Sequence, residues 1–153
     1  MNTRLQYKLD LIRCQKKIET IRGIGTNYQV LEKDKIENLQ IFTKCITEIS
    51  TYKAIYEGTN LLFKSNCDNQ KNVFFESLQY LINIKNDLMI FLSDNFILRF
   101  SINDLDQFID SWKRLNQTFD MIIFNEIAVL VIHELEDYSL SIHFNYIINN
   151  TQN

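Results

Sequence analysis

Apolar residues recur with two different periods along this chain. In roughly the first two thirds they fall at spacings of three and four, the pattern of an amphipathic helix. In the last third they alternate with polar residues, the pattern of a half-buried strand. The chain has 153 residues, no proline and three glycines, so few residues interrupt either period. Because the length suits one domain and no linker is visible, residues 1–153 are expected to form a single α+β domain.

Two helices are expected in the N-terminal part. The first spans about residues 3–22 and ends at the glycines of Gly23–Gly25. The second starts near Tyr28 or Asp34 and runs to residue 57. A short glycine-containing connection predicts that the two pair as an antiparallel helix hairpin with coiled-coil-like packing. The apolar stripes that define them are Tyr7, Leu11, Cys14, Ile18 and Ile21, and then Leu39, Phe42, Ile46, Ile49 and Tyr56.

A third helix is expected at about residues 72–92, and a fourth follows the capping box at Ser101 and ends near residue 117. Between them, residues 96–102 alternate apolar and polar positions, which indicates a short strand or an extended linker. Ser101 and Asp104 have the S-x-x-D spacing of a capping box at the start of the fourth helix. The apolar stripes are Phe74, Leu78, Leu81, Leu88 and Phe91, and then Leu105, Phe108, Trp112 and Leu115.

The last third is the least helical part. Residues 127–132 are a continuous apolar run, and residues 138–148 alternate apolar and polar positions on the far side of an acidic turn at 134–137. This order predicts a small C-terminal antiparallel β-hairpin. Short apolar runs fit helix and strand alike, so a buried helix over residues 121–135, and with it an all-α bundle, stays open. The expected fold is α+β, with helical N-terminal two thirds and this hairpin.

No catalytic, cofactor-binding or metal-binding residue is assigned. Cys14, Cys45 and Cys67 are far apart, which favours reduced thiols over a zinc or redox motif. The sequence HELED from His133 resembles the start of a helical zinc motif, but Asp137 stands where a second histidine is needed. Nucleophile-elbow and phosphate-loop signatures are also missing. A non-enzyme is therefore expected, with catalysis by a histidine and a carboxylate as the alternative.

Charge is distributed unevenly along the chain. The net charge is −3, yet residues 1–22 hold six basic and two acidic side chains, and residues 101–153 hold two basic and eight acidic ones. The two ends could pack together and cancel, or be solvated separately. Alternatively, clustered acids steer and dock a basic partner. The candidate partner-binding residues are Asp104, Asp106, Asp110, Glu134, Glu136 and Asp137.

These features predict a protein-binding module without catalytic activity. The most concrete form is an intracellular inhibitor or immunity protein that neutralises a basic toxin or nuclease domain. A structural subunit that assembles through the N-terminal helices is the alternative. The acidic remainder argues against nucleic acid, and Asp10 and Glu19 on the first helix argue against a membrane surface. Without a signal segment or a membrane-spanning run, the expected compartment is the cytoplasm. The partner's identity and the oligomeric state stay open.

Overall fold

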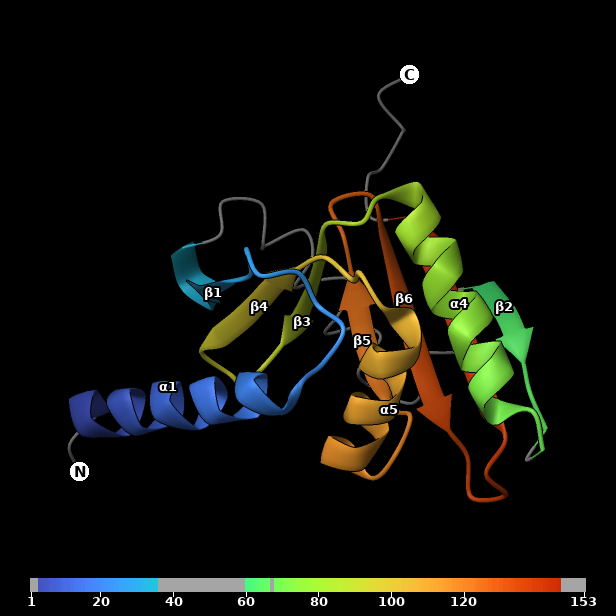
Figure 1. The fold of residues 1–153 in the computed structure, drawn as a ribbon, viewed down its shortest axis with the longest axis horizontal. Coiled ribbons are helices and arrows are strands. Elements are labelled where there is room, and N and C mark those ends of the chain that lie inside the picture. Colours follow the sequence, from blue (N-terminus) through green and yellow to red (C-terminus); the bar gives the residue numbers. More distant parts are fainter. Residues whose placement is uncertain (1–2, 36–59, 67, 147–153) are drawn as a thin grey trace.

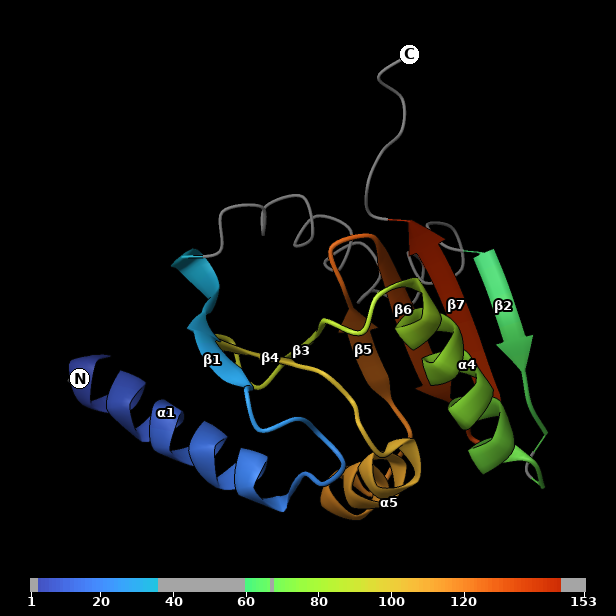
Figure 2. The same ribbon diagram turned by 45° about the horizontal axis from the view of Figure 1, so that its top comes forward.

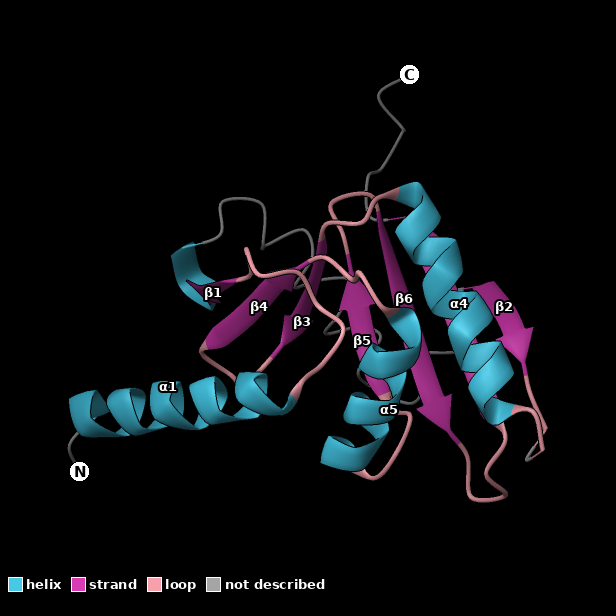
Figure 3. Cartoon of the chain, in the orientation of Figure 1, coloured by secondary structure: helices cyan, strands magenta, loops and turns pink. Residues whose placement is uncertain are grey.

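A computed structural model describes residues 3–35, 60–66 and 68–146, which form three α-helices and one antiparallel sheet (Figures 1 and 3). The helices are α1 (Thr3–Thr20), α4 (Gln70–Ile84) and α5 (Leu105–Asn116), with a single 3₁₀ turn at Lys33–Lys35. The strands are β1 (Gln29–Glu32), β2 (Asn60–Lys64), β3 (Leu88–Phe91), β4 (Phe96–Phe100), β5 (Met121–Phe124), β6 (Ala128–Glu134) and β7 (Leu140–Tyr146).

The sheet combines local hairpins with edge strands from elsewhere in the chain. Its seven described strands are ordered β1-β4-β3-β5-β6-β7-β2. Strands β3 and β4 form one hairpin, and β5, β6 and β7 form a meander. The two edges come from the N-terminal half, since Gln29 lies opposite Arg99 and Asn60 opposite Phe144. The N-terminal half is therefore tied to the C-terminal half through main-chain hydrogen bonds.

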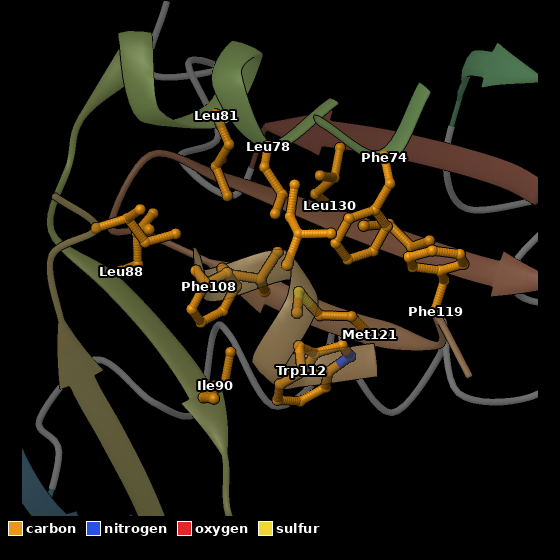
Figure 4. Close-up of a cluster of buried hydrophobic side chains, with 14 of the residues drawn as sticks. Phe74, Leu78, Leu81, Leu88, Ile90, Phe108, Trp112, Phe119, Met121 and Leu130 are labelled. Atoms are coloured by element: carbon orange, nitrogen blue, oxygen red, sulfur yellow. The ribbon is translucent and has the colours of Figure 1, made fainter. Parts of the chain in front are cut away.

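Helices α4 and α5 cover one face of the sheet (Figures 1 and 2). Phe74, Leu78 and Leu81 of α4 and Phe108 of α5 are completely buried there against alternate residues of the central strands such as Leu130, as Figure 4 shows. Burying a side chain of this size stabilises the fold by about 1.5–3 kcal/mol. Across the described residues, no helix combines the length and the apolar character needed to cross a membrane.

The opposite face of the central strands is buried as well. Phe124 and Val129 are completely buried and lie opposite each other in the β5–β6 pair. Val131 and His143 are the next pair on this face, and both are buried. A strand buried on both faces has a continuous apolar sequence and no alternation. This explains the apolar run at residues 127–132.

The C-terminal end of helix α1 is hydrogen-bonded to the region of α5. Gly23 has a φ of 76°, in the left-handed region, and its carbonyl oxygen accepts hydrogen bonds from the backbone N–H groups of Asn103 (2.8 Å) and Asp104 (3.0 Å). A Cβ at Gly23 would lie 2.1 Å from the carbonyl oxygen of Asp104, so the two backbones can approach this closely only at a glycine. The Arg22 N–H also donates to the Ser111 hydroxyl (2.9 Å). The turn after α1 thus docks onto the start and middle of α5.

The predicted fold was wrong in its proportions. The chain does not have helical N-terminal two thirds with a small hairpin, nor is it an all-α bundle, because the sheet runs through most of the described chain. The expected second helix lies mainly outside the described residues, at 36–57, and residues 29–32 at its optional start form β1. The third helix ends at Ile84, not at residue 92, and Leu88 and Phe91 of its stripe belong to β3.

Other predicted elements are confirmed. The helix at residues 3–22 is α1, the fourth helix, expected to end near residue 117, is α5, and the alternating segment at 96–102 is β4. The C-terminal hairpin is β6 and β7, joined at the expected acidic turn. Residues 121–134 hold β5 and most of the expected first hairpin strand, so the buried-helix alternative for 121–135 is wrong. The capping residue of α5 also differs: Asp104 itself is the N-cap, and not Ser101.

Candidate binding surface

The acidic residues of α5 have different surroundings. Asp104 caps the helix, because its side chain accepts a hydrogen bond from the Gln107 N–H at 3.1 Å. Asp106 and Asp110 lie one turn apart and are exposed. Lys71, in the first turn of α4, forms an ion pair with Asp110 at 2.9 Å. The first two turns of α5 therefore lie beside the start of α4.

The β6–β7 turn holds the other predicted acids. The Glu134 side chain is only 10% exposed, and its carboxylate lies 3.2 Å from the Lys113 ammonium group on α5. Asp137 stabilises the turn by accepting hydrogen bonds from the backbone and the hydroxyl of Ser139. Glu136 is exposed at the tip. Glu134 and Asp137 therefore have structural contacts of their own, whereas Glu136 projects into solvent.

Three contacts bring these segments together at one end of the molecule. Lys71 joins α4 to α5, Lys113 joins α5 to β6, and the side-chain amide of Gln70 donates to the carbonyl oxygen of Tyr138 in the β6–β7 turn. This end lies at the bottom of Figure 1, where α5 finishes and the turn projects. We call it the acidic end, and it comprises six carboxylates and two lysines: Asp106, Asp110, Asp120, Glu134, Glu136, Asp137, Lys71 and Lys113.

The sequence prediction located most of this surface and missed three of its members, Asp120, Lys71 and Lys113. Five of the six predicted residues belong to the acidic end. Asp104 does not belong to it, because it is the N-cap of α5, two residues before Asp106, and its backbone N–H donates to the Gly23 carbonyl oxygen. Asp120 was not predicted, although its carboxylate accepts a hydrogen bond from the Glu134 N–H at 2.7 Å. Lys71 was not predicted because it precedes α5 by more than thirty residues, and only the packing of α4 brings it to Asp110.

The carboxylates of α5 change the pKa of Lys71 at the start of α4. The hydrogen bond to Asp110 is the main cause that raises the pKa of Lys71, followed by the charge of Asp110, with a further contribution from Asp106. A raised lysine pKa means that the neighbouring charges favour the ammonium form.

The acidic turn borders an open hollow of about 430 Å³ lined by residues 133–137. The imidazole Nδ1 of His133 lies 3.6 Å from the Asp120 carboxylate. In the described part of the chain, no group of three or more histidine, cysteine, aspartate or glutamate residues is arranged to hold a metal ion. The arrangement places negative charge and hydrogen-bond acceptors at the surface.

The second histidine and the described cysteine lie in the interior. His143 is only 3% exposed and shares a 2.8 Å hydrogen bond with the Ser141 hydroxyl. Burial is the main cause that lowers its pKa, and the charge of His133 lowers it further. Cys14 is buried on α1 as predicted, and burial raises the pKa of its thiol. Cys45 and Cys67 lie outside the described residues.

The fold and this surface together define an α+β domain with a two-sided sheet core and a carboxylate-rich end. Searches against protein-family models, curated proteins and solved structures found no match.

Proposed function

We propose that this chain is a non-catalytic protein-binding module that docks a basic partner through its acidic end. The concrete form is an intracellular inhibitor or immunity protein that covers a basic toxin or nuclease domain in the cytoplasm. The observation that carries the proposal is the meeting of α4, α5 and the β6–β7 turn, which gathers five of the six predicted acids. Nuclease sites are basic because they bind phosphate, so a surface of this charge complements them.

The contacts divide the acidic end into docking and positioning residues. Asp106 and Glu136 are exposed and face a partner's cations. Asp110 and Asp137 are exposed as well, and their carboxylates also contact Lys71 and Ser139. Glu134 is mostly buried between Lys113 and the backbone N–H of Phe119, so its role is to hold the turn against α5. Clustered exposed charges act mainly on the association rate, and their effect is screened over about 8 Å at physiological salt.

Charge-neutralising variants test this proposal. One variant carries Asp106→Asn, Asp110→Asn, Glu136→Gln and Asp137→Asn, which remove charge and keep the shape of each side chain. The matched control removes the same charge elsewhere and carries Glu19→Gln, Asp34→Asn, Asp94→Asn and Glu126→Gln, all at exposed acids outside the acidic end.

The measurement is the association rate with a basic protein domain, and the first candidate to test is the product of the reading frame beside this one in the source genome. We expect the association rate of the acidic-end variant to be lower by about tenfold or more and to depend less on salt. Steering by clustered charge raises association rates by at least about tenfold. The control should associate at the unmodified rate. Equal losses in both variants, or no loss in either, would reject the acidic end as the docking surface.

The alternative is a structural subunit assembled through the N-terminal helices. The stripe from Tyr7 to Ile21 does not supply such an interface, because Cys14, Ile18 and Ile21 are buried in this chain's own core. The second stripe, at residues 39–56, lies outside the described residues. Light scattering distinguishes the two functions, since a stable dimer at micromolar concentration favours the subunit and a monomer favours the binding module.

A further inference from the structure

Helix α1 carries apolar side chains on two opposite faces. Cys14, Ile18 and the following Ile21 point into the core. Leu5, Leu9 and Ile12 are spaced by four and by three residues, so they form a second stripe on the other side of the helix. These three side chains are 52%, 42% and 48% exposed. An exposed helical stripe of large aliphatic residues is a common feature of interaction sites.

The exposed stripe is flanked by positive charge. At 3.6 residues per turn, Lys8 and Arg13 lie on either side of it and Lys16 continues it by one further turn. Of the two acids in α1, Asp10 is turned toward the rest of the molecule, where its carboxylate accepts hydrogen bonds from the Ser93 hydroxyl (2.6 Å) and the Asn95 amide (3.0 Å). Near its middle, this face therefore presents basic side chains around aliphatic ones.

The same face of α1 leads into a hollow. Beyond Lys16, the next residues on this face are Glu19 and Thr20, which line a hollow of about 430 Å³ between the end of α1 and α5. Two arginines, Arg22 and Arg114 of α5, are among its lining residues, against one acid, Glu19. Its lining residues are Glu19, Thr20, Arg22, Ser111, Arg114 and Leu115. The exposed stripe thus ends beside a concave site with two arginines.

We propose that this face of α1, from Leu5 to the arginine-bordered hollow, docks an acidic amphipathic helix of a partner protein. The partner helix lays its apolar residues on Leu5, Leu9 and Ile12 and directs carboxylates to the flanking cations, with one acidic side chain entering the hollow. This surface is formed mainly by α1, shares only α5 with the acidic end, and carries cations where the acidic end carries carboxylates. It is therefore a second binding site and does not depend on the first.

Charge complementarity selects this occupant over two others. Stacking α1 on α1 of a second copy would oppose the basic residues of both helices, which is unfavourable for like charges. An anionic membrane would attract the same cations, but a flat bilayer surface does not enter a concave hollow, whereas a carboxylate side chain of a helix can. An acidic helical segment satisfies the aliphatic stripe, the cations and the hollow together.

The test uses designed peptides as probes and the full chain as the receptor. The first peptide has the 18-residue length of α1, leucines at spacings of four and three, and glutamates on either side. The second has the same composition with the leucines distributed around the helix. Fluorescence anisotropy measures binding of each labelled peptide at low and at physiological salt.

Three variants of the chain locate the site. Leu9→Gln with Ile12→Gln removes the stripe, and Lys8→Gln, Arg13→Gln and Lys16→Gln remove the flanking charge. These side chains are exposed, and glutamine is a good helix former, so α1 is retained. Tyr138→Asn is the matched control, because Tyr138 is an exposed large side chain on the distant β6–β7 turn with a φ of 65°, which asparagine tolerates.

We expect the ordered peptide to bind. The scrambled peptide should bind with an affinity at least about tenfold lower, since apolar anchor residues contribute most of the binding energy at such an interface. The stripe variant should lose about tenfold in affinity, and the charge variant should lose the salt dependence. The Tyr138→Asn control and the acidic-end variant should bind as the unmodified chain does. A loss confined to the acidic-end variant would overturn the α1 site and leave the proposed function standing.

Other outcomes also reject the proposal. Equal binding of the two peptides, or no binding of the ordered one, means that α1 does not specifically bind an amphipathic acidic helix. Self-association of the unmodified chain that the stripe variant abolishes assigns the face to a second copy. Co-sedimentation with phosphatidylserine vesicles that is lost in the same variant, without peptide binding, assigns it to a membrane surface.

Discussion

Asp87 and Arg99 form a two-point ion pair beside the β3–β4 hairpin. The Arg99 Nε donates to one carboxylate oxygen at 2.8 Å, and its Nη2 donates to the other at 2.5 Å. The hydrogen bonds from this guanidinium are the main cause that lowers the pKa of Asp87 below its ordinary value of 3.8. Because β1 pairs with β4 at Arg99, the ion pair lies close to the edge of the sheet.

Asp87→Asn removes this ion pair. At neutral pH we expect a loss of about 0.5–1 kcal/mol in the free energy of unfolding, the upper range for a partly exposed pair with two hydrogen bonds. The unfolded state binds the proton more readily, so the contribution of Asp87 is present above its unfolded pKa near 3.8 and is lost as the pH falls through its lower folded pKa. Urea denaturation at pH 7 and pH 3 measures both values.

Asp94→Asn is the control for this substitution, since Asp94 is an exposed acid in the neighbouring turn. It should change stability little at either pH. A difference between the Asp87→Asn variant and the unmodified protein that is as large at pH 3 as at pH 7 would contradict the ion pair.

Gly23→Ala should be strongly destabilising. A side chain there would face both the positive φ of 76° and the carbonyl oxygen of Asp104 at 2.1 Å. The backbone strain alone amounts to about 1–3 kcal/mol, and displacement of α5 adds to it. Thermal unfolding measures the loss. Gly25→Ala is the control, because its Cβ would lie 2.7 Å from the rotatable hydroxyl of Ser101 and no closer than 3.9 Å to a backbone atom, so a smaller loss is expected.

Asn125→Leu should cost about 2–4 kcal/mol. Asn125 is completely buried, and its side-chain oxygen accepts hydrogen bonds from the N–H groups of Ile127 and Ala128, both at 2.8 Å. Its amide also donates to the carbonyl oxygen of Lys85, at the end of α4. Leucine would leave these buried backbone groups unsatisfied. Urea unfolding of Asn103→Leu, at an exposed asparagine, gives the baseline, and similar losses in both would disprove this role.

His143 should make the protein less stable on the acidic side of neutrality. Burial lowers its pKa below the ordinary 6.5, so the unfolded chain takes up a proton that the folded chain does not. Stability is therefore highest above pH 6.5 and falls as the pH is lowered toward the folded pKa, by at most about 1.4 kcal/mol per pH unit for one proton. Unfolding curves between pH 7.5 and 5.5, about a unit on either side of 6.5, follow this effect.

His143→Gln should flatten that dependence in this range of pH. The chain has one other histidine, so His133→Gln provides the comparison. If the dependence of stability on pH persists in His143→Gln and disappears in His133→Gln, it arises from His133, and the prediction is refuted.

The helices of this fold were easier to predict from the sequence than the sheet. Helices α1 and α5 have long stripes bounded by a glycine or a capping residue, and such signals are local. Strand β3 was taken for helix because Leu88 and Phe91 also fit the helical spacing. Its hydrogen bonds come from β4 and β5, and that pairing is not visible in a short apolar run. Strands β1 and β2 depend on still more distant partners.

The candidate surfaces show the same limit. The acids of α5 and the β6–β7 turn are visible as a change in composition, and the meander brings them to one end. The sequence does not show the individual roles of these acids. Asp104 is an N-cap because α5 begins directly after it, and Glu134 is mostly buried because Lys113 of α5 packs against it. The stripe at Leu5, Leu9 and Ile12 can be read from the sequence, but only the burial of the opposite face shows which of two stripes is exposed.

The hydrogen bonds at Gly23 also fix the separation between the two proposed binding sites. Because α1 is fixed to α5 through Gly23, Arg22 and Ser111, its exposed stripe cannot swing relative to the acidic end of the same α5 helix. A partner bearing both a basic patch and an acidic helix would gain avidity only if its linker spans that fixed separation. Shortening such a linker should abolish the gain abruptly, whereas a hinged α1 would let it decline gradually.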